Sequence, residues 1–129
     1  MAKAVLYIDD NPDNLVLVER MLKKRPELRV ICAENARDGL ALAASESPSL
    51  ILLDRRLPDM SGNEVLRQLK AAGPTAAIPV VILSGDAGRE HVDELMELGA
   101  VEFLAKPFNL HQLTAVVERF CAAGRDLDA

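Results

Sequence analysis

The feature that most constrains the fold of this chain is a regular alternation of short apolar runs with longer segments of helical periodicity. The apolar runs have the length of strands and lie at residues 4–8, 29–33, 50–53, 80–83 and 101–105. Between and after them, apolar side chains recur every three or four positions, as on one face of a helix. This alternation predicts an α/β fold in which a parallel, doubly wound sheet carries helices on both faces.

Single residues mark the ends of the predicted helices. Asn11, Asn35, Ser61 and Asn109 each precede a helical segment, and their side chains suit the N-terminal cap position. Gly99 follows the helix predicted at residues 87–98, where a left-handed C-terminal cap is expected. We therefore predict helices that start directly after these caps, with short connections to the strands.

The run Leu50–Leu53 consists of four aliphatic residues, which predicts a strand buried on both faces. Asp54 follows it at once. The carboxyl edge of an open α/β sheet is where ligands bind, and a carboxylate at that edge need not be buried. Asp54 is therefore interpreted as an acid presented to a ligand.

Length and composition bound the architecture. We predict one domain over residues 1–129, with a core at about 4–122 and a polar tail at 123–129. No apolar run approaches the ~20 residues of a membrane-spanning helix, and the N-terminus lacks the pattern of a signal peptide. We expect a cytoplasmic protein in which Cys32 and Cys121 are isolated thiols.

The charge of the chain argues against one class of partner. Its net charge is −5, aromatic residues are scarce and tryptophan is absent. Nucleic-acid binding needs a basic patch, and single strands also need aromatic platforms. We therefore expect no direct contact with nucleic acid. His91 and His111 lie on predicted helices away from the strand ends and are interpreted as surface residues.

Four of the five predicted strands end in polar residues that can do chemistry: Asp9 with Asp10, Asp54, Ser84 and Lys106. Singly, each suits a helix cap, a turn or a solvated charge, but together they share one edge of a parallel sheet. Three neighbouring carboxylates repel one another, and oxygen ligands suit Mg²⁺. With a lysine and a hydroxyl to receive phosphate, the set predicts a phosphoryl-transfer site whose acceptor is Asp54.

The loop after the first predicted strand argues against an alternative function, the binding of FMN or a dinucleotide. A doubly wound domain that binds FMN or a dinucleotide holds phosphate in a loop rich in Gly, Ser or Thr. Here residues 9–14 read DDNPDN. This loop is anionic and repels a phosphate unless a cation lies between them, which argues against such a cofactor.

Four motifs in this order resemble the receiver domain of two-component response regulators. They are IDDN at 8–11, LLD at 52–54 with LPDMSG at 57–62, LSG at 83–85, and FLAKPF at 103–108. Each is weak alone, but together they are specific, and the resemblance covers residues 4–122. It implies a flavodoxin-like, five-stranded parallel sheet of order 2-1-3-4-5 with five helices, similar to the chemotaxis regulators.

The resemblance also implies roles for individual residues. Asp54 matches the phosphorylated aspartate and Lys106 the lysine that pairs with the phosphate. Ser84 matches the switch hydroxyl and Phe103 the switch aromatic. The bond between Lys106 and Pro107 is expected to be cis, because this turns the lysine toward the phosphate.

For the Mg²⁺ cofactor, the resemblance implies three protein ligands and one residue that acts through water. The ligands are the carboxylates of Asp10 and Asp54 and the backbone carbonyl of Arg56. Asp9 is the residue expected to act through water.

The implied phosphodonor is the phosphohistidine of a sensor histidine kinase or of a phosphotransfer protein. The chain is then a signalling module in a phosphorelay that assists its own phosphorylation and dephosphorylation, and it is not an enzyme. Phosphorylation is expected to change the face formed by the fourth helix, fifth strand and fifth helix, which a downstream protein reads. Both a stand-alone regulator and the receiver of a hybrid kinase fit the motifs.

Two alternative functions are weighed against this switch. A hydrolase with an aspartyl-phosphate intermediate usually has a second aspartate two positions after the nucleophile, where this chain has Arg56, which takes up no proton. A receiver-like scaffold that works without phosphorylation usually lacks one of the acids or the lysine, all of which are present here. Arg56 and Asp86 are predicted to modulate the phosphoryl lifetime as a pair across the site. The alternative is that they are two independent solvated charges.

Overall fold

The computed structural model describes residues 3–85 and 89–122, in which five strands form a parallel sheet. The strands are β1 (Lys3–Ile8), β2 (Leu28–Ala33), β3 (Leu50–Asp54), β4 (Val80–Ser84) and β5 (Glu102–Ala105). Their order across the sheet is β2-β1-β3-β4-β5, as predicted. All five observed strands correspond to the five apolar runs, so the sequence pattern located the whole sheet.

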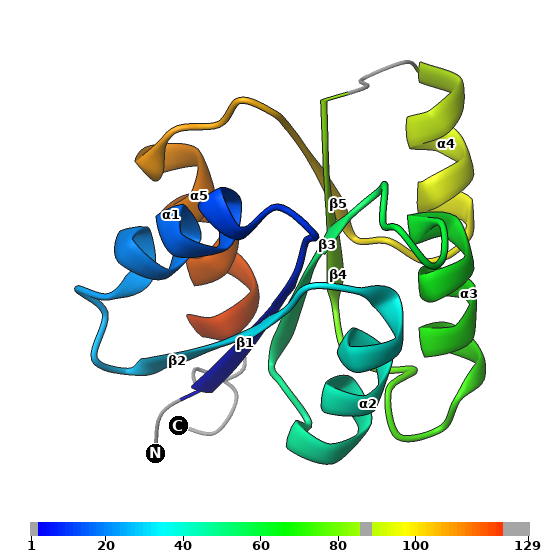
Figure 1. The fold of residues 1–129 in the computed structure, drawn as a ribbon, viewed down its shortest axis with the longest axis horizontal. Helices are drawn as coiled ribbons and strands as arrows, with labels where there is room; N and C mark the ends of the chain where they lie inside the picture. The colour runs from blue at the N-terminus through cyan, green and yellow to red at the C-terminus, as the bar shows by residue number, and fades with distance from the viewer. Residues whose placement is uncertain (1–2, 86–88, 123–129) are drawn as a thin grey trace.

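Helices cover both faces of this sheet (Figure 1). They are α1 (Pro12–Leu22), α2 (Ala36–Glu46), α3 (Gly62–Ala71), α4 (Arg89–Glu97) and α5 (Leu110–Val117), and the π-helical segment η1 (Glu118–Ala122) continues α5. Helices α1 and α5 pack on one face, and α2, α3 and α4 on the other (Figure 1). The flavodoxin-like arrangement is therefore confirmed, and the predicted start of α4 at residue 87 lies outside the described residues.

The predicted caps are present. The side chains of Asn11, Asn35, Ser61 and Asn109 accept hydrogen bonds from backbone N–H groups in the first turns of α1, α2, α3 and α5. Gly99 has a φ of 115°, in the left-handed region that favours glycine. The starts of α1, α2, α3 and α5 and the turn after α4 are therefore fixed by local features.

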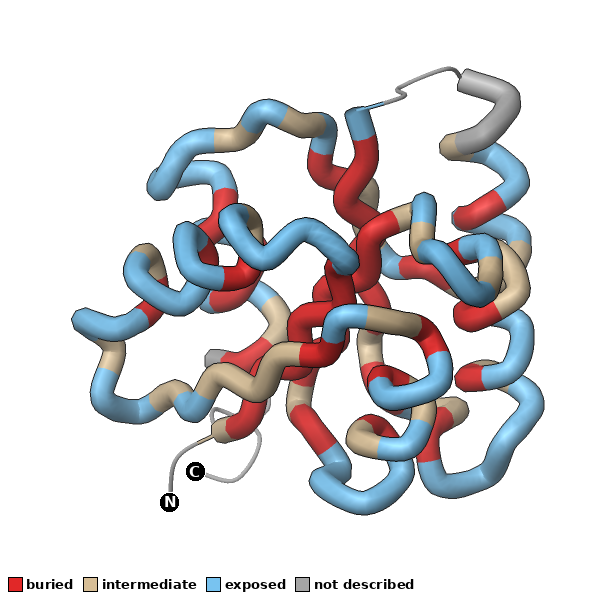
Figure 2. Tube along the Cα trace, in the orientation of Figure 1, coloured by how far each residue is buried: buried red, intermediate tan, exposed pale blue. Residues whose placement is uncertain are grey.

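The core consists of two apolar layers, one on each side of the sheet. Side chains of β1, β3 and β4 are buried along the strands, whereas β2, at the edge, is largely half-buried (Figure 2). Alternate residues of β1 enter opposite layers: Leu6 and Ile8 pack with the α2–α3–α4 layer, and Val5 and Tyr7 with the α1–α5 layer. The central strands therefore form a rigid base for the residues at their carboxyl ends.

Several smaller predictions are also settled. Cys32 and Cys121 are free cysteines, the first half-buried and the second buried. His111 is exposed, and the side chain of His91 lies outside the described residues. The peptide bond between Lys106 and Pro107 is cis, as expected. Among the described residues, no helix has the length and apolar character needed to cross a membrane.

Candidate functional site: an acidic pocket at the carboxyl edge of the sheet

The parallel strands bring the predicted site residues to one edge. Asp54 ends β3 and pairs in register with Leu83 of β4, whose next residue is Ser84. Ser84 in turn pairs with Ala105 at the end of β5, and its carbonyl accepts the N–H of Lys106 at 2.8 Å. A pocket opens here, lined by Asp10, Asp54, Arg56, Ser84, Gly85 and Lys106.

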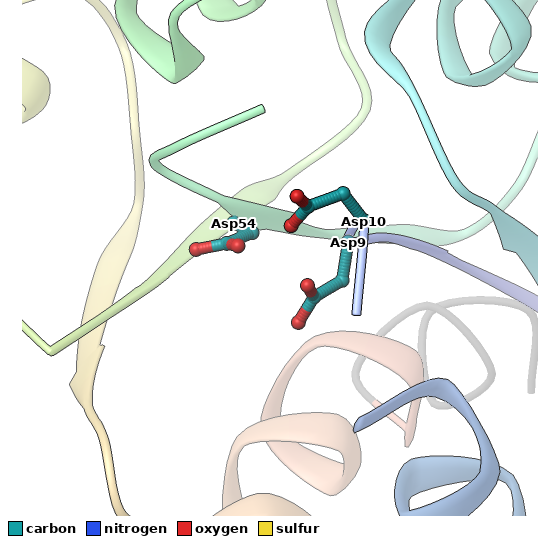
Figure 3. A group of neighbouring side chains, drawn as sticks. All are labelled: Asp9, Asp10 and Asp54. Carbon is teal, nitrogen blue, oxygen red and sulfur yellow. The ribbon is translucent and has the colours of Figure 1, made fainter. Parts of the chain in front are cut away.

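Three carboxylates converge at this edge (Figure 3). Asp9 and Asp10 follow β1 and Asp54 ends β3, and one oxygen from each lies within 4.8 Å of the others. Asp9 and Asp54 are buried, whereas Asp10 is exposed. Clustered carboxylate oxygens of this kind are the ligands that a hard divalent cation such as Mg²⁺ prefers, so the donor set fits the predicted ion.

Lys106 supplies the positive charge of the pocket. Its ammonium nitrogen lies 3.2 Å from Oδ2 of Asp9 and 3.4 Å from Oδ1 of Asp54. The lysine thus bridges two buried acids that come from different strands. Such a bridge partly offsets the repulsion between the two carboxylates.

Besides Lys106, three other groups donate hydrogen bonds to the Asp9 carboxylate. Its Oδ2 also accepts hydrogen bonds from the Tyr7 hydroxyl at 2.5 Å and the Asn14 side-chain amide at 3.1 Å, and its Oδ1 accepts the N–H of Asn11 at 3.0 Å. Burial by itself raises the pKa of Asp9, but the hydrogen bonds from Tyr7 and Asn11 and the charge of Lys106 outweigh it, so this pKa lies below its ordinary value. Asp9 is therefore ionised and fixed in orientation.

Asp54 lies in a different electrostatic environment. Burial raises the pKa of Asp54 to about 6, while the Lys106 ammonium opposes this rise and the charge of Asp9 adds to it. The sequence predicts an acid that need not be buried, but Asp54 is only 8% exposed. Residues from the loops that follow β1 and β3, Asp10 and Arg56, line the pocket with Asp54, so Asp54 is presented to a pocket and not to open solvent.

The loop between β3 and α3 is tied down at both ends. The N–H of Gly62 donates to the carbonyl of Arg55 at 2.7 Å, and Arg56 pairs with Ser61 in an isolated antiparallel bridge. A Cβ at position 62 would lie 2.8 Å from the Cα of Arg55, so this contact requires glycine. The backbone of Arg56 is consequently held beside the pocket.

Asp59 joins the same loop to a second element. Its carboxylate accepts the backbone N–H groups of Ala36 and Arg37 at 2.9 and 3.0 Å, at the start of α2. These two hydrogen bonds lower the pKa of Asp59, which favours the ionised cap. The β3–α3 loop is thereby anchored to a helix that lies 22 residues or more away in sequence.

The two predicted switch residues occupy neighbouring strands. Ser84 is buried at the end of β4, and Phe103 of β5 is half-buried against the α2–α3–α4 layer. Phe103 pairs in register with Ile82, two residues before Ser84. Asp86, predicted to face Arg56, lies outside the described residues.

Tyr7 and Asn14 were not predicted as partners of Asp9. Tyr7 was predicted only as part of an apolar strand, although it lies two residues before Asp9 and hence on the same face of the chain. That spacing is the signal from which the contact could have been found. Asn14 carries no comparable signal, because its contact depends on how α1 leaves the first loop.

The family model for the response regulator receiver domain matches residues 5–118. The chain belongs to this family. A curated relative, protein PilH of Pseudomonas aeruginosa, is 32% identical over 120 residues, which cover 92% of this chain and 97% of PilH. Receiver domains are signalling modules rather than classical enzymes.

Solved structures agree with this assignment. The Vibrio cholerae chemotaxis protein CheY4 is 26% identical, has a TM-score of 0.87, and the match covers 93% of this chain and 99% of that one. The receiver domain of sensor histidine kinase PA1611 from Pseudomonas aeruginosa PAO1 is also 26% identical, with a TM-score of 0.84 and 93% and 98% covered. Its structure holds a magnesium ion coordinated in the active-site cleft.

Other receiver-containing relatives are longer than this chain. Two curated relatives with 33% and 35% identity match over 28% and 30% of their own length. This chain therefore matches less than a third of the length of these two relatives.

Proposed function

We propose that this receiver domain accepts a phosphoryl group on Asp54 and acts as a phosphorelay switch. The donor is the phosphohistidine of a sensor histidine kinase or of a phosphotransfer protein. The observation that supports this most directly is the Lys106 ammonium, 3.2 Å from Asp9 and 3.4 Å from Asp54, beside three converging carboxylates. A nucleophile, a cation site and a positive charge for phosphate thus share one pocket.

The proposed metal ligands follow from the positions of the three acids and of Arg56 at the pocket. The two oxygens of Asp9 already accept from four donors, which is about the capacity of a carboxylate. Asp10 is exposed to the pocket, and Arg56 is held next to it. We therefore assign Asp10, Asp54 and the Arg56 carbonyl as direct ligands and Asp9 as a residue that acts through water. When bound, Mg²⁺ would neutralise charge on the transferred phosphoryl group.

The transfer itself is a displacement at phosphorus. A carboxylate oxygen of Asp54 forms a bond to the phosphorus of the donor as the phosphorus–nitrogen bond breaks, and the bonding electron pair returns to the imidazole, which takes up a proton. Hydrolysis restores the Asp54 carboxylate: water attacks the phosphorus and releases a proton to solvent, the bond from phosphorus to the Asp54 oxygen breaks with its electron pair returning to the carboxylate, and inorganic phosphate leaves. In both steps Lys106 provides a positive charge for the phosphoryl oxygens.

The output follows from the position of Ser84 and Phe103. A phosphoryl group on Asp54 offers strong acceptor oxygens to the Ser84 hydroxyl at the end of the adjacent strand. Movement of Ser84 toward the phosphate leaves space into which the Phe103 ring turns. The face of α4, β5 and α5 then changes by a shift in population between two states, and a downstream protein reads it.

Arg56 argues against a hydrolase at this site. It occupies the second position after the acceptor and lines the pocket, where a hydrolase of the aspartyl-phosphate type usually has an acid. A guanidinium remains protonated in proteins and so activates no water. A scaffold that works without phosphorylation is also disfavoured, because such a protein has no need of an ionised acid pair bridged by lysine.

We place the protein in the cytoplasm, where the ATP that feeds histidine kinases is found. The free thiols of Cys32 and Cys121 are compatible with a reducing compartment. The net charge of −5 supports a protein partner over direct nucleic-acid binding.

The test of this function is incubation with Mg²⁺ and acetyl phosphate, followed by intact-mass spectrometry. The wild-type protein should gain one phosphoryl group and lose it on standing at neutral pH, and Asp54→Ala should gain none. Asp13→Asn, which removes an exposed acid from the first turn of α1, is the matched control and should be labelled like the wild type. Equal labelling of wild type and Asp54→Ala would refute the assignment.

A further inference from the structure

Asp9 receives an unusual number of hydrogen bonds on a single oxygen. Its Oδ2 accepts from the Tyr7 hydroxyl at 2.5 Å, from the Asn14 amide at 3.1 Å and from Lys106 at 3.2 Å. Two of these donors are neutral and one is charged. Removing the charged donor would therefore still leave Oδ2 with two hydrogen bonds.

The burial of this group makes the two neutral donors important. Asp9 is 1% exposed and Tyr7 is fully buried. A buried carboxylate that loses its cation is strongly destabilised unless other donors satisfy it. Under the proposed function, Lys106 must turn from Asp9 toward the phosphoryl group on Asp54, so the charge of Asp9 needs support at that moment.

A phenol is otherwise hard to explain at position 7. The side chain lies in the apolar layer beneath α1 and α5, where phenylalanine would fill nearly the same volume without a polar atom to satisfy. Burial and the neighbouring Asp9 raise the pKa of Tyr7 above its ordinary value, so the hydroxyl stays protonated and donates. The hydroxyl is thus a permanent donor aimed at one oxygen of the site.

We propose that Tyr7 is a positioning residue that holds the Asp9 carboxylate in place and thereby allows Lys106 to transfer to the phosphoryl group. This inference rests on the proposed function and deepens it. Asn14 assists from the start of α1, on the same oxygen. Without the Tyr7 hydroxyl, Asp9 retains Lys106 more strongly, and capture of the phosphoryl group becomes slower.

The test is the rate at which Tyr7→Phe gains a phosphoryl group from acetyl phosphate at saturating Mg²⁺. Loss of one hydrogen bond should slow this step roughly threefold to tenfold. Because the effect acts through Lys106, Tyr7→Phe should cause no further slowing in a Lys106→Met background. Asn14→Ala, at a half-exposed position, should slow the step in the same direction, and its effect should also vanish in that background.

Thr75→Val is the matched control for loss of a buried hydroxyl. Thr75 Oγ1 donates to the carbonyl of Leu69 at 2.7 Å in the loop before β4, at the opposite edge of the sheet. This variant should lose stability and keep the wild-type rate of phosphorylation. The comparison separates a role in the site from a role in folding alone.

Two results would overturn the inference while leaving the proposed function intact. The first is that Tyr7→Phe and Asn14→Ala are both phosphorylated at the wild-type rate. The second is that Tyr7→Phe slows phosphorylation by the same factor in the wild-type background and in the Lys106→Met background. A wild-type protein that gains no phosphoryl group would instead overturn the proposed function, and this inference with it.

Discussion

The Lys106 ammonium lies 3.4 Å from Oδ1 of Asp54, although their strands are separated by β4 in the sheet. The backbone holds this pair in place, since the N–H of Lys106 donates to the carbonyl of Ser84 at the end of β4. The cation is thus already positioned beside the proposed acceptor. We therefore expect metal and lysine to compete for the same acids before phosphorylation.

Replacing Lys106 with methionine should separate metal binding from phosphorylation. Removing a positive charge a few ångströms from the carboxylates should strengthen Mg²⁺ binding by roughly tenfold, while phosphorylation by acetyl phosphate slows markedly because the phosphoryl oxygens lose their cation. Titration with Mg²⁺ followed by nuclear magnetic resonance measures the first effect, and intact mass against time the second.

Lys70→Met provides the comparison for that variant. Lys70 is also half-buried, but its ammonium donates to the carbonyls of Ala76 and Ile78 in the loop before β4, far along the sheet from the pocket. Its replacement should leave both measurements unchanged. Weaker Mg²⁺ binding by Lys106→Met would show that the lysine supports the metal site and does not compete with it.

Asp54→Asn should stabilise the protein at neutral pH. The pKa of Asp54 is about 6 in the folded chain and 3.8 ordinarily, so ionisation costs folding free energy once the pH has risen through this window. The variant should therefore exceed the wild type by about 3 kcal/mol in free energy of unfolding at pH 7.5, with the difference vanishing below about pH 4. Urea titrations at several pH values measure this difference. A constant difference across pH would mean that the charge of Asp54 is not its cause.

Ser84→Ala should uncouple the site from the output face. Beryllofluoride with Mg²⁺ mimics the phosphoryl group, and in the wild type it should alter amide exchange in α4, β5 and α5. The alanine variant has no hydroxyl to follow the phosphate, so Phe103 should keep its position and the change in exchange should be much smaller. An unchanged response in Ser84→Ala would place the output route elsewhere.

Arg56 and Asp86 should set the lifetime of the phosphoryl group if they pair over it. Such a pair partly covers the line along which water attacks, although an exposed ion pair adds only about 0–1 kcal/mol to stability. Dephosphorylation should then be faster in Arg56→Ala and in Asp86→Ala, with no further gain in the double variant. Additive effects, or none, would show that the two side chains do not act together.

The fold followed from the sequence because its signals are local. Each strand is a short apolar run, and the caps at Asn11, Asn35, Ser61 and Asn109 lie directly before the helices that they begin. Parallel strands share one edge, so Asp54, Ser84 and Lys106 could be brought together from their positions at strand ends alone. No further information was needed for those residues.

Features that depend on packing between distant segments were not predicted. Asp59 caps α2 across the β3–α3 loop, and the end of α5 continues as the π-helical segment Glu118–Ala122. The burial of Asp54 and the hydrogen bond from the Tyr7 hydroxyl to Asp9 were not predicted either. Both depend on loop conformations and side-chain rotamers at the strand ends. The pattern of apolar residues does not predict contacts of this kind.

The central claim is that Asp54 is the phosphoryl acceptor, and chemical trapping of the acyl phosphate tests it most directly. Borohydride reduces a phosphorylated aspartate to homoserine, which peptide mass spectrometry locates in the sequence. After incubation of the wild-type protein with acetyl phosphate, we predict homoserine at position 54, only when Mg²⁺ is present. Homoserine at position 9, 10 or any other acid, or none at all under conditions in which the protein is folded and binds Mg²⁺, would contradict the account.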